Sequence, residues 1–446
     1  MLSTSQPCTK SRLRAFVALL GLLLGLVAIA PSISAAGGVP DREAIKQDLW
    51  NRLEARGLNV ANVSSCKDRD GFSRYICQWR AEGMWPGEIP YRCSGRARYD
   101  VAPDSWRIQR CRNQIASRVP LTDQLLPHPL FGYNESWNTH ANRIGLISGS
   151  GSEIARQELY WTAVERERGT YDWDRMDGYH DDLISAGVTP LYKISGSPCW
   201  AQQNRLACEN GNTDLRPTPE HYNEMADFAV AAAGRYDGEI AGIEVWNEPN
   251  SDDFWGGAPQ PERWAQMVGA VADAVHAADS DVPVVSGGLH PFANAGSGGV
   301  PPEEFLNRAY REGGPQRADA IGYHPYAGRA FDDDYLGSIR IQLFEIQRAM
   351  RAHGDAGKDI WATETGVSTA GPGAYGEGQQ AEALERTYHQ FRRIEGVPVV
   401  VYHRFADQSG GALSRESGYG VINQNGLRKM AYCRVAAEAG DPGPCG

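Results

Sequence analysis

Short apolar segments alternate with longer helical stretches from about residue 120 to the carboxyl terminus of this 446-residue chain. No other feature restricts the fold as strongly, because this alternation predicts βαβ units whose successive strands are parallel. The clearest helices are expected at 219–235, 261–278, 336–353 and 379–394. The eight expected strands are residues 130–133, 154–158, 189–194, 240–246, 282–287, 320–324, 360–364 and 397–403.

Eight strand–helix units over roughly 310 residues predict an α/β fold of the (β/α)8 TIM barrel type. A doubly wound open sheet, the main alternative, places a glycine-rich phosphate loop after its first strand. Here the first strand leads into N-E-S-W at 134–137 instead, which disfavours that alternative. We therefore expect residues 120–446 to form one barrel with a cysteine-containing tail.

The region before the barrel has a different pattern and a high cysteine content. Residues 41–57 have a helical apolar period, and strands are expected at 75–82, 91–99 and 106–111. These elements predict a small α+β domain over residues 40–117. Domains of this size bury a limited core and are commonly stapled by disulfides.

The first 36 residues predict a secretory signal peptide. Three basic residues precede a continuous apolar or glycine stretch at 15–30, and small residues suited to cleavage occupy 34–36. The apolar stretch is short for a membrane-spanning helix. We therefore expect no stable membrane insertion and a secreted, periplasmic or cell-surface protein.

Cysteine usage fits an oxidising compartment, because eight cysteines, an even number, remain outside the signal segment. The early cluster of four allows three connectivities. Zinc-type C-x-x-C spacing is absent, and we expect neither a metal nor another cofactor. The preferred pairs are Cys199–Cys208, Cys433–Cys445, Cys66–Cys77 and Cys93–Cys111.

The chain is acidic, with 44 Lys and Arg against 55 Asp and Glu and a formal net charge of −11. An acidic surface disfavours nucleic-acid phosphates or an anionic bilayer as the main partner. The sequence also lacks G-x-S-x-G, H-E-x-x-H and G-x-x-x-x-G-K-[ST] motifs. It gives no indication of the oligomeric state.

Two glutamates follow expected strands of the barrel. A W-N-E-P-N string ends strand four at 246–250, and E-T-G ends strand seven at 364–366. Since the carboxyl ends of barrel strands meet on one face, Glu248 and Glu364 are expected to lie together there. Two carboxylates flanking an acetal carbon are what glycoside hydrolysis requires, one to protonate the leaving oxygen and one to attack or to activate water.

At these positions the sequence resembles clan A glycoside hydrolases. The strings at 246–250 and 364–366, with Y-H-P-Y at 323–326, are similar to that clan's motifs after strands four, seven and six. The segment from R-Q-E-L-Y-W at 156–161 to G-T-Y-D-W at 169–173 resembles glycoside hydrolase family 39 and its bacterial exopolysaccharide-hydrolase relatives. The resemblance covers roughly residues 120–432.

The resemblance implies a retaining mechanism with Glu248 as acid/base and Glu364 as nucleophile, their carboxyl groups about 5–5.5 Å apart. It implies that Asn247 bonds the sugar hydroxyl beside the reacting carbon. Arg156, expected at the end of strand two, would lie near Glu364 and lower its pKa. Tyr326 would donate a hydrogen bond to the nucleophile.

Further side chains are expected to contact sugar. Many clan members have a tryptophan under the sugar after strand eight, where this chain has Y-H-R-F at 402–405, so His403 is a candidate. His324 either contacts the sugar or supports Tyr326, and Asn134 follows the first strand. Tryptophan faces stack on the C–H faces of pyranoses, so Trp200 and Trp255 are candidate platforms, with burial as the alternative for both.

The sequence thus predicts a secreted retaining glycosidase that cleaves within a polysaccharide. An exo-acting enzyme of the β-xylosidase or iduronidase kind would use the same carboxylate pair. Two further possibilities are transglycosylation through the same covalent intermediate and a non-catalytic carbohydrate-binding barrel. An oligo- or polysaccharide is the expected partner, while loops rather than the barrel select the sugar and the linkage.

Overall fold

The structure is a computed structural model, and it divides into two compact units. One comprises Met1–Trp79 with Gly95–Gln109, and the other Arg80–Ser94 with Arg110–Gly446. The expected signal peptide, residues 1–36, lies outside the described residues. The structure describes residues 41–54, 60–69, 73–85, 89–101, 105–108, 125–135, 141–203, 205–209, 215–278, 280–293, 295–326, 333–411 and 413–439.

The amino-terminal part contains one helix and a four-stranded sheet of order β1-β2-β3-β4, in which β3 and β4 are antiparallel. Strand β1 is absent from the sequence-based expectation. Its buried apolar residues Val60, Val63 and Cys66 recur every third position, which hides the period of two that signals a strand. The elements are α1 (Arg42–Glu54), β1 (Val60–Asp68), β2 (Arg74–Trp85), β3 (Ile89–Asp100) and β4 (Ser105–Ile108).

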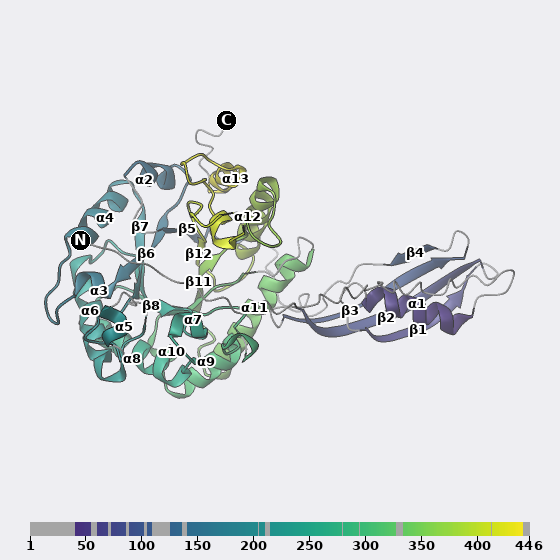
Figure 1. Ribbon diagram of the computed structural model, residues 1–446, viewed down its shortest axis with the longest axis horizontal. Coiled ribbons are helices and arrows are strands. Elements are labelled where there is room, and N and C mark those ends of the chain that lie inside the picture. Colours follow the sequence, from purple (N-terminus) through teal and green to yellow (C-terminus); the bar gives the residue numbers. More distant parts are fainter. Residues whose placement is uncertain are drawn as a thin grey trace, which may run out of the picture. The chain divides into compact units, whose positions relative to one another are not determined.

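The larger unit contains a closed barrel of eight parallel strands (Figure 1), in the order β10-β11-β12-β5-β6-β7-β8-β9. Each strand overlaps one of the eight expected from the sequence, so the predicted (β/α)8 barrel is confirmed. The strands are β5 (Leu130–Glu135), β6 (Ile154–Tyr160), β7 (Thr189–Ser195), β8 (Gly242–Asn247), β9 (Val284–Gly288), β10 (Ala320–Tyr323), β11 (Asp359–Thr365) and β12 (Val399–Tyr402).

Helices surround the barrel, and the four predicted from the sequence are α6, α8, α11 and α12 (Figure 1). Among the helices of the described segments, none combines the length and apolar character needed to cross a membrane. The α-helices are α2 (Ala141–Ser148), α3 (Trp161–Val164), α4 (Asp174–Ser185), α5 (Arg205–Glu209), α6 (Tyr222–Arg235), α7 (Asp252–Trp255), α8 (Pro261–Ala277), α9 (Pro302–Arg311), α10 (Gly314–Arg317), α11 (Asp333–Ala352), α12 (Glu377–Phe391) and α13 (Met430–Glu438).

The barrel interior changes from apolar to charged along the strands. Ile154 and Leu191, from β6 and β7, belong to a small apolar cluster separate from the core beneath the helices. Because side chains alternate along a strand, the residues two positions further on also face the interior. These are Arg156 and Lys193, both buried. The charged layer therefore sits at the carboxyl ends of the strands, on the face where barrel sites form.

At Gly132 the backbones of β5 and β6 approach too closely for a side chain, so a substitution at this position tests the packing of the barrel. A Cβ atom at this position would stand 1.7 Å from the carbonyl oxygen of Ile154 on β6. We expect Gly132→Ala to lower the free energy of unfolding by about 3 kcal/mol, because the neighbouring backbone has to shift. Urea unfolding followed by circular dichroism measures the loss.

Gly145→Ala is the matched control, because a Cβ at this exposed position in α2 meets nothing within 4 Å. Alanine is the better helix former by about 1 kcal/mol, so this variant should be as stable as the parent or more stable. Equal unfolding curves for the two variants would contradict the proposed barrel packing.

Candidate active site

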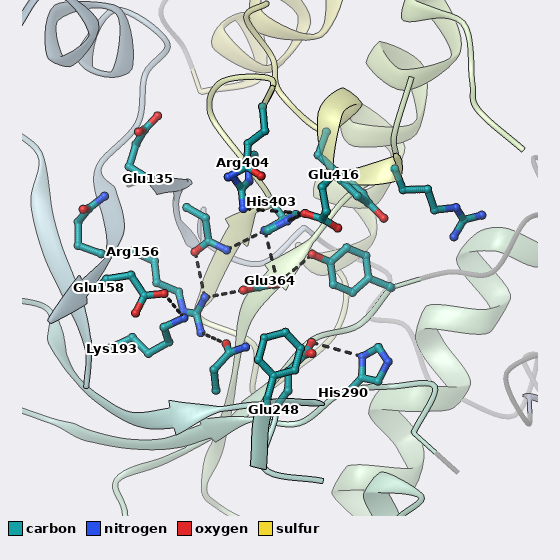
Figure 2. A pocket seen from close by; sticks show the side chains of 18 of the residues that line it. Glu135, Arg156, Glu158, Lys193, Glu248, His290, Glu364, His403, Arg404 and Glu416 are labelled. Atoms are coloured by element: carbon teal, nitrogen blue, oxygen red, sulfur yellow. Dashed lines mark hydrogen bonds and ion pairs between the residues drawn. The ribbon is translucent and has the colours of Figure 1, made fainter. Parts of the chain in front are cut away.

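A buried arginine connects the polar side chains at the carboxyl ends of the strands (Figure 2). Arg156 on β6 donates from Nε to Glu244 (2.5 Å) and from Nη1 to Glu364 (2.6 Å). It also donates from Nη1 to Asn134 (3.1 Å) and from Nη2 to Asn247 (3.0 Å). One guanidinium thereby fixes side chains from β5, β8 and β11 relative to one another.

Glu244 is the fully buried anchor of this arginine. Its Oε1 accepts hydrogen bonds from the backbone N–H of Gly288 (2.9 Å) and the hydroxyl of Thr363 (2.9 Å). Burial by itself would lower the pKa of Arg156, but Glu244 and Glu364 outweigh it and raise the pKa, so the guanidinium stays charged. Glu244 is therefore a structural carboxylate, since both of its oxygens already accept hydrogen bonds from the protein.

The end of strand β8 departs from regular strand geometry where it enters the site. Trp246 and Glu248 have positive φ angles of 76° and 41°, a rare conformation for residues with a side chain. Glu244 and Asn247 both contact Arg156, although residues three apart face opposite sides of a regular strand. The positive φ angle at Trp246 thus turns Asn247 toward the barrel interior. The Glu248 N–H remains bonded to the Gly288 carbonyl (2.9 Å).

Strand β11 presents Glu364 through an irregularity of a similar kind. The pairing of β11 with β12 shifts register between Ala362 and Thr365. Ala362 packs in the core beneath the helices, and in unbroken alternation Glu364 would face the same way. The shift instead turns Glu364 toward Arg156, which is the usual effect of a β-bulge beside a functional site.

The two glutamates meet at the barrel mouth. One oxygen of Glu248, one oxygen of Glu364 and a ring nitrogen of His324 all lie within 4.8 Å of one another. Both carboxylates are buried, with 6% and 8% of their surface exposed. This separation is well below the range of about 6.5–9.5 Å that leaves room for a water between two carboxyl groups.

Glu364 is held as an anion. Tyr326 donates its hydroxyl to Oε2 (3.0 Å), and Arg156 donates to Oε1. Burial would raise the pKa of Glu364, but the nearby basic side chains of His324, His403, Arg156 and Lys193 hold the pKa well below its ordinary value. Burial and the nearby carboxylates raise the pKa of Tyr326, so its phenol remains a donor.

Glu248 lies against two imidazoles. Nδ1 of His324 donates to its Oε1 (2.7 Å), and Nδ1 of His290 lies 3.3 Å from the same oxygen. Burial would raise the pKa of Glu248, but the contacts with His290 and His324 outweigh it and lower the pKa to about 2. Burial lowers the pKa of His290, yet the interaction with Glu248 is stronger and raises it above its ordinary value.

His290 was missed by the sequence analysis. It lies two residues past the end of β9. The sequence-based prediction ended this strand at residue 287, so His290 was not considered as a residue at the strand end. Asn250 positions it from the loop after β8. Its Nδ2 donates to the His290 carbonyl (2.8 Å), and its Oδ1 accepts from the His290 N–H (2.7 Å).

The residue after β12 is His403, which lies at the barrel mouth. Nδ2 of Asn134 donates to Nδ1 of His403 (3.1 Å), and Nε2 of His403 donates to Glu416 (2.9 Å). Since Asn134 also accepts from Arg156, a continuous chain of hydrogen bonds runs from Arg156 to Glu416. Sequence reasoning missed Glu416, which lies in a short 3-10 helix (Arg415–Gly418) with no motif around it.

These side chains line a cavity of about 850 Å³ (Figure 2). Of the side chains expected to contact sugar, Asn134, Arg156, Asn247, Tyr326 and His403 are in its lining. The other described lining residues include the carboxylate pair and Glu135, which the sequence places beside Asn134 after the first strand as a further residue that could contact sugar. The rest had no sugar contact assigned from the sequence, namely Arg143, Gln157, Glu158, Tyr160, Lys193, Ser251, Asp253, Phe254, His290, Phe292, Arg404, Ala406, Asp407, Gln408, Arg415, Glu416 and Tyr419.

Three candidates lie outside this lining. His324 is completely buried and supports Glu248, so it offers no surface to a sugar. Trp255 is also completely buried, and the expectation that it forms a stacking platform is wrong. Trp200 packs edge-on against Trp161 (5.4 Å between ring centroids) and donates to the Glu165 carbonyl (3.3 Å), beside the barrel core.

Among the described residues, two groups of side chains have the spacing of metal ligands. In the first, Glu248, His324 and Glu364, a cation would compete with the guanidinium and phenol that already bond Glu364. In the second, Glu385, His389 and Glu438 lie together on α12 and α13. There His389 pairs with Glu438 (3.0 Å), and Arg434 donates to Glu385 (2.7 Å).

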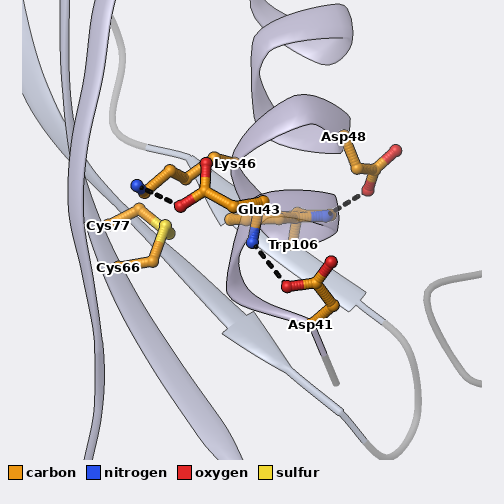
Figure 3. Close-up of a disulfide and its surroundings, with 7 residues drawn as sticks. All are labelled: Asp41, Glu43, Lys46, Asp48, Cys66, Cys77 and Trp106. Atoms are coloured by element: carbon orange, nitrogen blue, oxygen red, sulfur yellow. Dashed lines mark hydrogen bonds and ion pairs between the residues drawn. A yellow bond between two sulfur atoms is a disulfide. The ribbon is translucent and has the colours of Figure 1, made fainter.

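The structure contains two of the four preferred disulfides in full. Cys66 bonds Cys77 (Figure 3), and Cys199 bonds Cys208. Cys433 is disulfide-bonded as well, while its expected partner Cys445 lies outside the described residues. The remaining preferred pair, Cys93–Cys111, stays a prediction because the structure does not describe Cys111.

No known protein-family model matches the sequence. A family 39 glycoside hydrolase from Bacteroides cellulosilyticus WH2 aligns with a TM-score of 0.56 and 19% identity over 82% of this chain and 70% of its own. A glucosidase from Croceicoccus marinus aligns at 0.53 and 13% over 72% and 69%. A GH5_18 enzyme from Streptomyces cattleya, in complex with Manβ1-4GlcNAc, aligns at 0.52 and 13% over 70% and 80%. The chain therefore has the barrel fold of these glycoside hydrolases.

The contact between Glu248 and His290 predicts how the pKa of His290 changes when the Glu248 carboxylate is removed. In Glu248→Gln the imidazole stays buried but loses the carboxylate that it contacts, so the pKa of His290 should fall from its raised value in the parent, while Glu364 and Asp253 remain nearby. Titration of ¹⁵N-labelled histidine side chains by NMR measures both values, with His290→Gln assigning the signal.

Glu416→Gln is the matched control, since Glu416 bonds His403 and does not contact His290. It should leave the His290 titration unchanged. The same pKa of His290 in the parent and in Glu248→Gln would contradict the described contact.

Proposed function

We propose that the protein is a retaining glycosidase that hydrolyses a glycosidic bond through a covalent intermediate on Glu364. The observation that carries this proposal is the closeness of two buried carboxylates that have different hydrogen-bond partners. Glu364 accepts from a guanidinium and a phenol, whereas Glu248 contacts only imidazoles that can carry a proton. An imidazole can supply a proton near neutral pH, so these surroundings suit Glu248 as the acid and Glu364 as the nucleophile.

In the first step, an oxygen of Glu364 attacks the anomeric carbon and the bond to the leaving oxygen breaks. The leaving oxygen takes a proton from Glu248 and departs as a hydroxyl group. The pKa of Glu248 is low and that of His290 is raised, so the resting pair keeps its proton on the imidazole. We infer that this proton reaches the leaving oxygen through Glu248 once bound sugar has excluded water.

In the second step, water attacks the anomeric carbon of the glycosyl ester and Glu364 leaves as a carboxylate. Glu248 accepts the proton of this water and acts now as a base. Arg156 and Tyr326 hold the departing carboxylate by the hydrogen bonds described above. Asn247, fixed by Arg156 at the edge of the cavity, is placed to bond the hydroxyl beside the reacting carbon.

We propose an oligo- or polysaccharide substrate cleaved within the chain, and export of the protein from the cytoplasm. The cavity of about 850 Å³ lies near the upper end of the range of about 300–1,000 Å³ typical of ligand sites, which supports binding of more than one sugar unit. The disulfides Cys66–Cys77 and Cys199–Cys208 support an oxidising compartment.

Azide rescue distinguishes the roles of the two glutamates. Glu364→Ala and Glu248→Ala should each lower turnover of 2,4-dinitrophenyl β-glycosides by orders of magnitude. With azide, Glu364→Ala should form the α-glycosyl azide by direct displacement. Glu248→Ala should form the β-glycosyl azide, because azide replaces water in the second step. NMR of the products reads the configuration.

Glu382→Ala, on the exposed surface of α12, is the matched control and should keep parental turnover. Azide products with exchanged configurations would contradict the assignment of the two roles. Undiminished turnover in either active-site variant, with the fold intact by circular dichroism, would contradict the proposed function. Binding of sugars without any release of product would favour a non-catalytic carbohydrate-binding barrel.

A further inference from the structure

A short helix beside the carboxylate pair is held rigidly and presents an exposed aromatic ring. In α7, Trp255 is completely buried, and the Arg216 guanidinium lies 4.8 Å from its ring centroid. Arg216 also donates to the carbonyls of Trp255 and Gly256. The Trp246 indole donates to the Phe254 carbonyl (3.0 Å). Contacts with Arg216 and with the Trp246 indole thus hold the backbone of α7 in place, and this backbone carries the Phe254 side chain.

Phe254 keeps 45% of its surface exposed and lines the cavity. A second ring, Phe292 from the turn after β9, is partly buried and also lines it. The Phe292 ring lies 6.0 Å from the ring of His290, nearly perpendicular to it, and His290 contacts Glu248. Single exposed apolar residues are ordinary on protein surfaces, but two aromatic rings lining one part of a polar cavity indicate a binding surface.

The position of Glu248 identifies which part of a substrate meets these rings. In the proposed mechanism Glu248 protonates the leaving oxygen, so the sugar beyond this oxygen lies on the Glu248 side of the pair. His290 and the loop that carries Phe292 form that side, and α7 begins four residues after Glu248. Arg156, Asn134 and His403 lie around Glu364 instead and face the other half of the substrate.

We propose that Phe254 and Phe292 form the leaving-group subsite, which takes a neutral pyranose unit through its C–H face. The inference rests on the proposed function and adds the chemical class of the leaving group. The Asp253 side chain lines the same part of the cavity, is exposed, and contributes with Glu248 to raising the pKa of His290. Because the Glu248–His290 pair carries no net charge, Asp253 supplies the negative charge of this subsite. Its carboxylate accepts hydrogen bonds from hydroxyl groups and disfavours a uronate or sulfated sugar.

Binding to a non-hydrolysing background tests the subsite. In Glu364→Gln, isothermal titration with cellotetraose, xylotetraose and mannotetraose should show binding of at least one neutral tetrasaccharide. Adding Phe254→Ala should weaken that binding by about tenfold, since truncation removes the apolar face that the sugar covers. Phe254→Tyr keeps the ring and should restore the parental Kd. The acidic probe tetragalacturonate should bind more weakly than the neutral tetrasaccharides in the parent background.

Leu427→Ala is the matched control, because Leu427 is 65% exposed and is not among the residues described as lining the cavity. It should leave every Kd unchanged. Thermal melting with each variant checks that the fold survives.

The outcomes separate this inference from the proposed function. Unchanged tetrasaccharide binding in Phe254→Ala, or tighter binding of tetragalacturonate than of any neutral tetrasaccharide, would overturn the subsite while leaving the glycosidase proposal standing. Binding of no saccharide by the Glu364→Gln parent would overturn both.

Discussion

The site depends on one buried guanidinium. Arg156 lies in the barrel with 3% of its surface exposed, and a buried charge of this kind is stable only when it is paired and its donors are used. Glu244 bonds its Nε, and Glu364 bonds its Nη1 at the cavity. Removing either partner would leave an uncompensated charge, so the position of Glu364 follows from the same arrangement that keeps the barrel interior stable.

Arginine suits this position better than lysine would. Its planar fork points donors in several directions at once, and here four different side chains accept from it. Those acceptors come from β5, β8 and β11, so the guanidinium fixes the register of distant strands at the cavity. The chain of hydrogen bonds through Asn134 to His403 extends the same control to the end of β12.

Breaks in regular strand geometry create the reactive pair. Regular alternation would leave Asn247 and Glu364 facing away from Arg156, and the left-handed residues of β8 and the register shift in β11 turn both toward it. Backbone strain of about 1–3 kcal/mol per residue persists only where surrounding contacts hold it. Here the bond between Glu248 and Gly288 and the Trp246 indole contact are two such restraints.

These breaks also mark where prediction from the sequence succeeds and where it stops. The eight strands were found because alternation of apolar strands and helices is imposed by the barrel itself. Glu248 and Glu364 were found because strand ends converge, whatever the local geometry. Phe254 was missed in favour of its neighbour Trp255, because a helix of four residues is too short for its hydrophobic periodicity to show which of the two rings is buried. His290 was missed because a strand boundary was misplaced by one residue and no motif surrounds it.

The central claim is that Glu364 itself attacks the anomeric carbon and does not instead activate a water molecule for that attack. It is tested most directly by the configuration of the first product, followed by ¹H NMR in D₂O from the earliest minutes of hydrolysis, before mutarotation. We expect a β-linked substrate to yield the β-hemiacetal first, with the α-anomer appearing later. Initial release of the α-anomer would contradict the claim, because inversion needs a water between two carboxylates that stand too close together here.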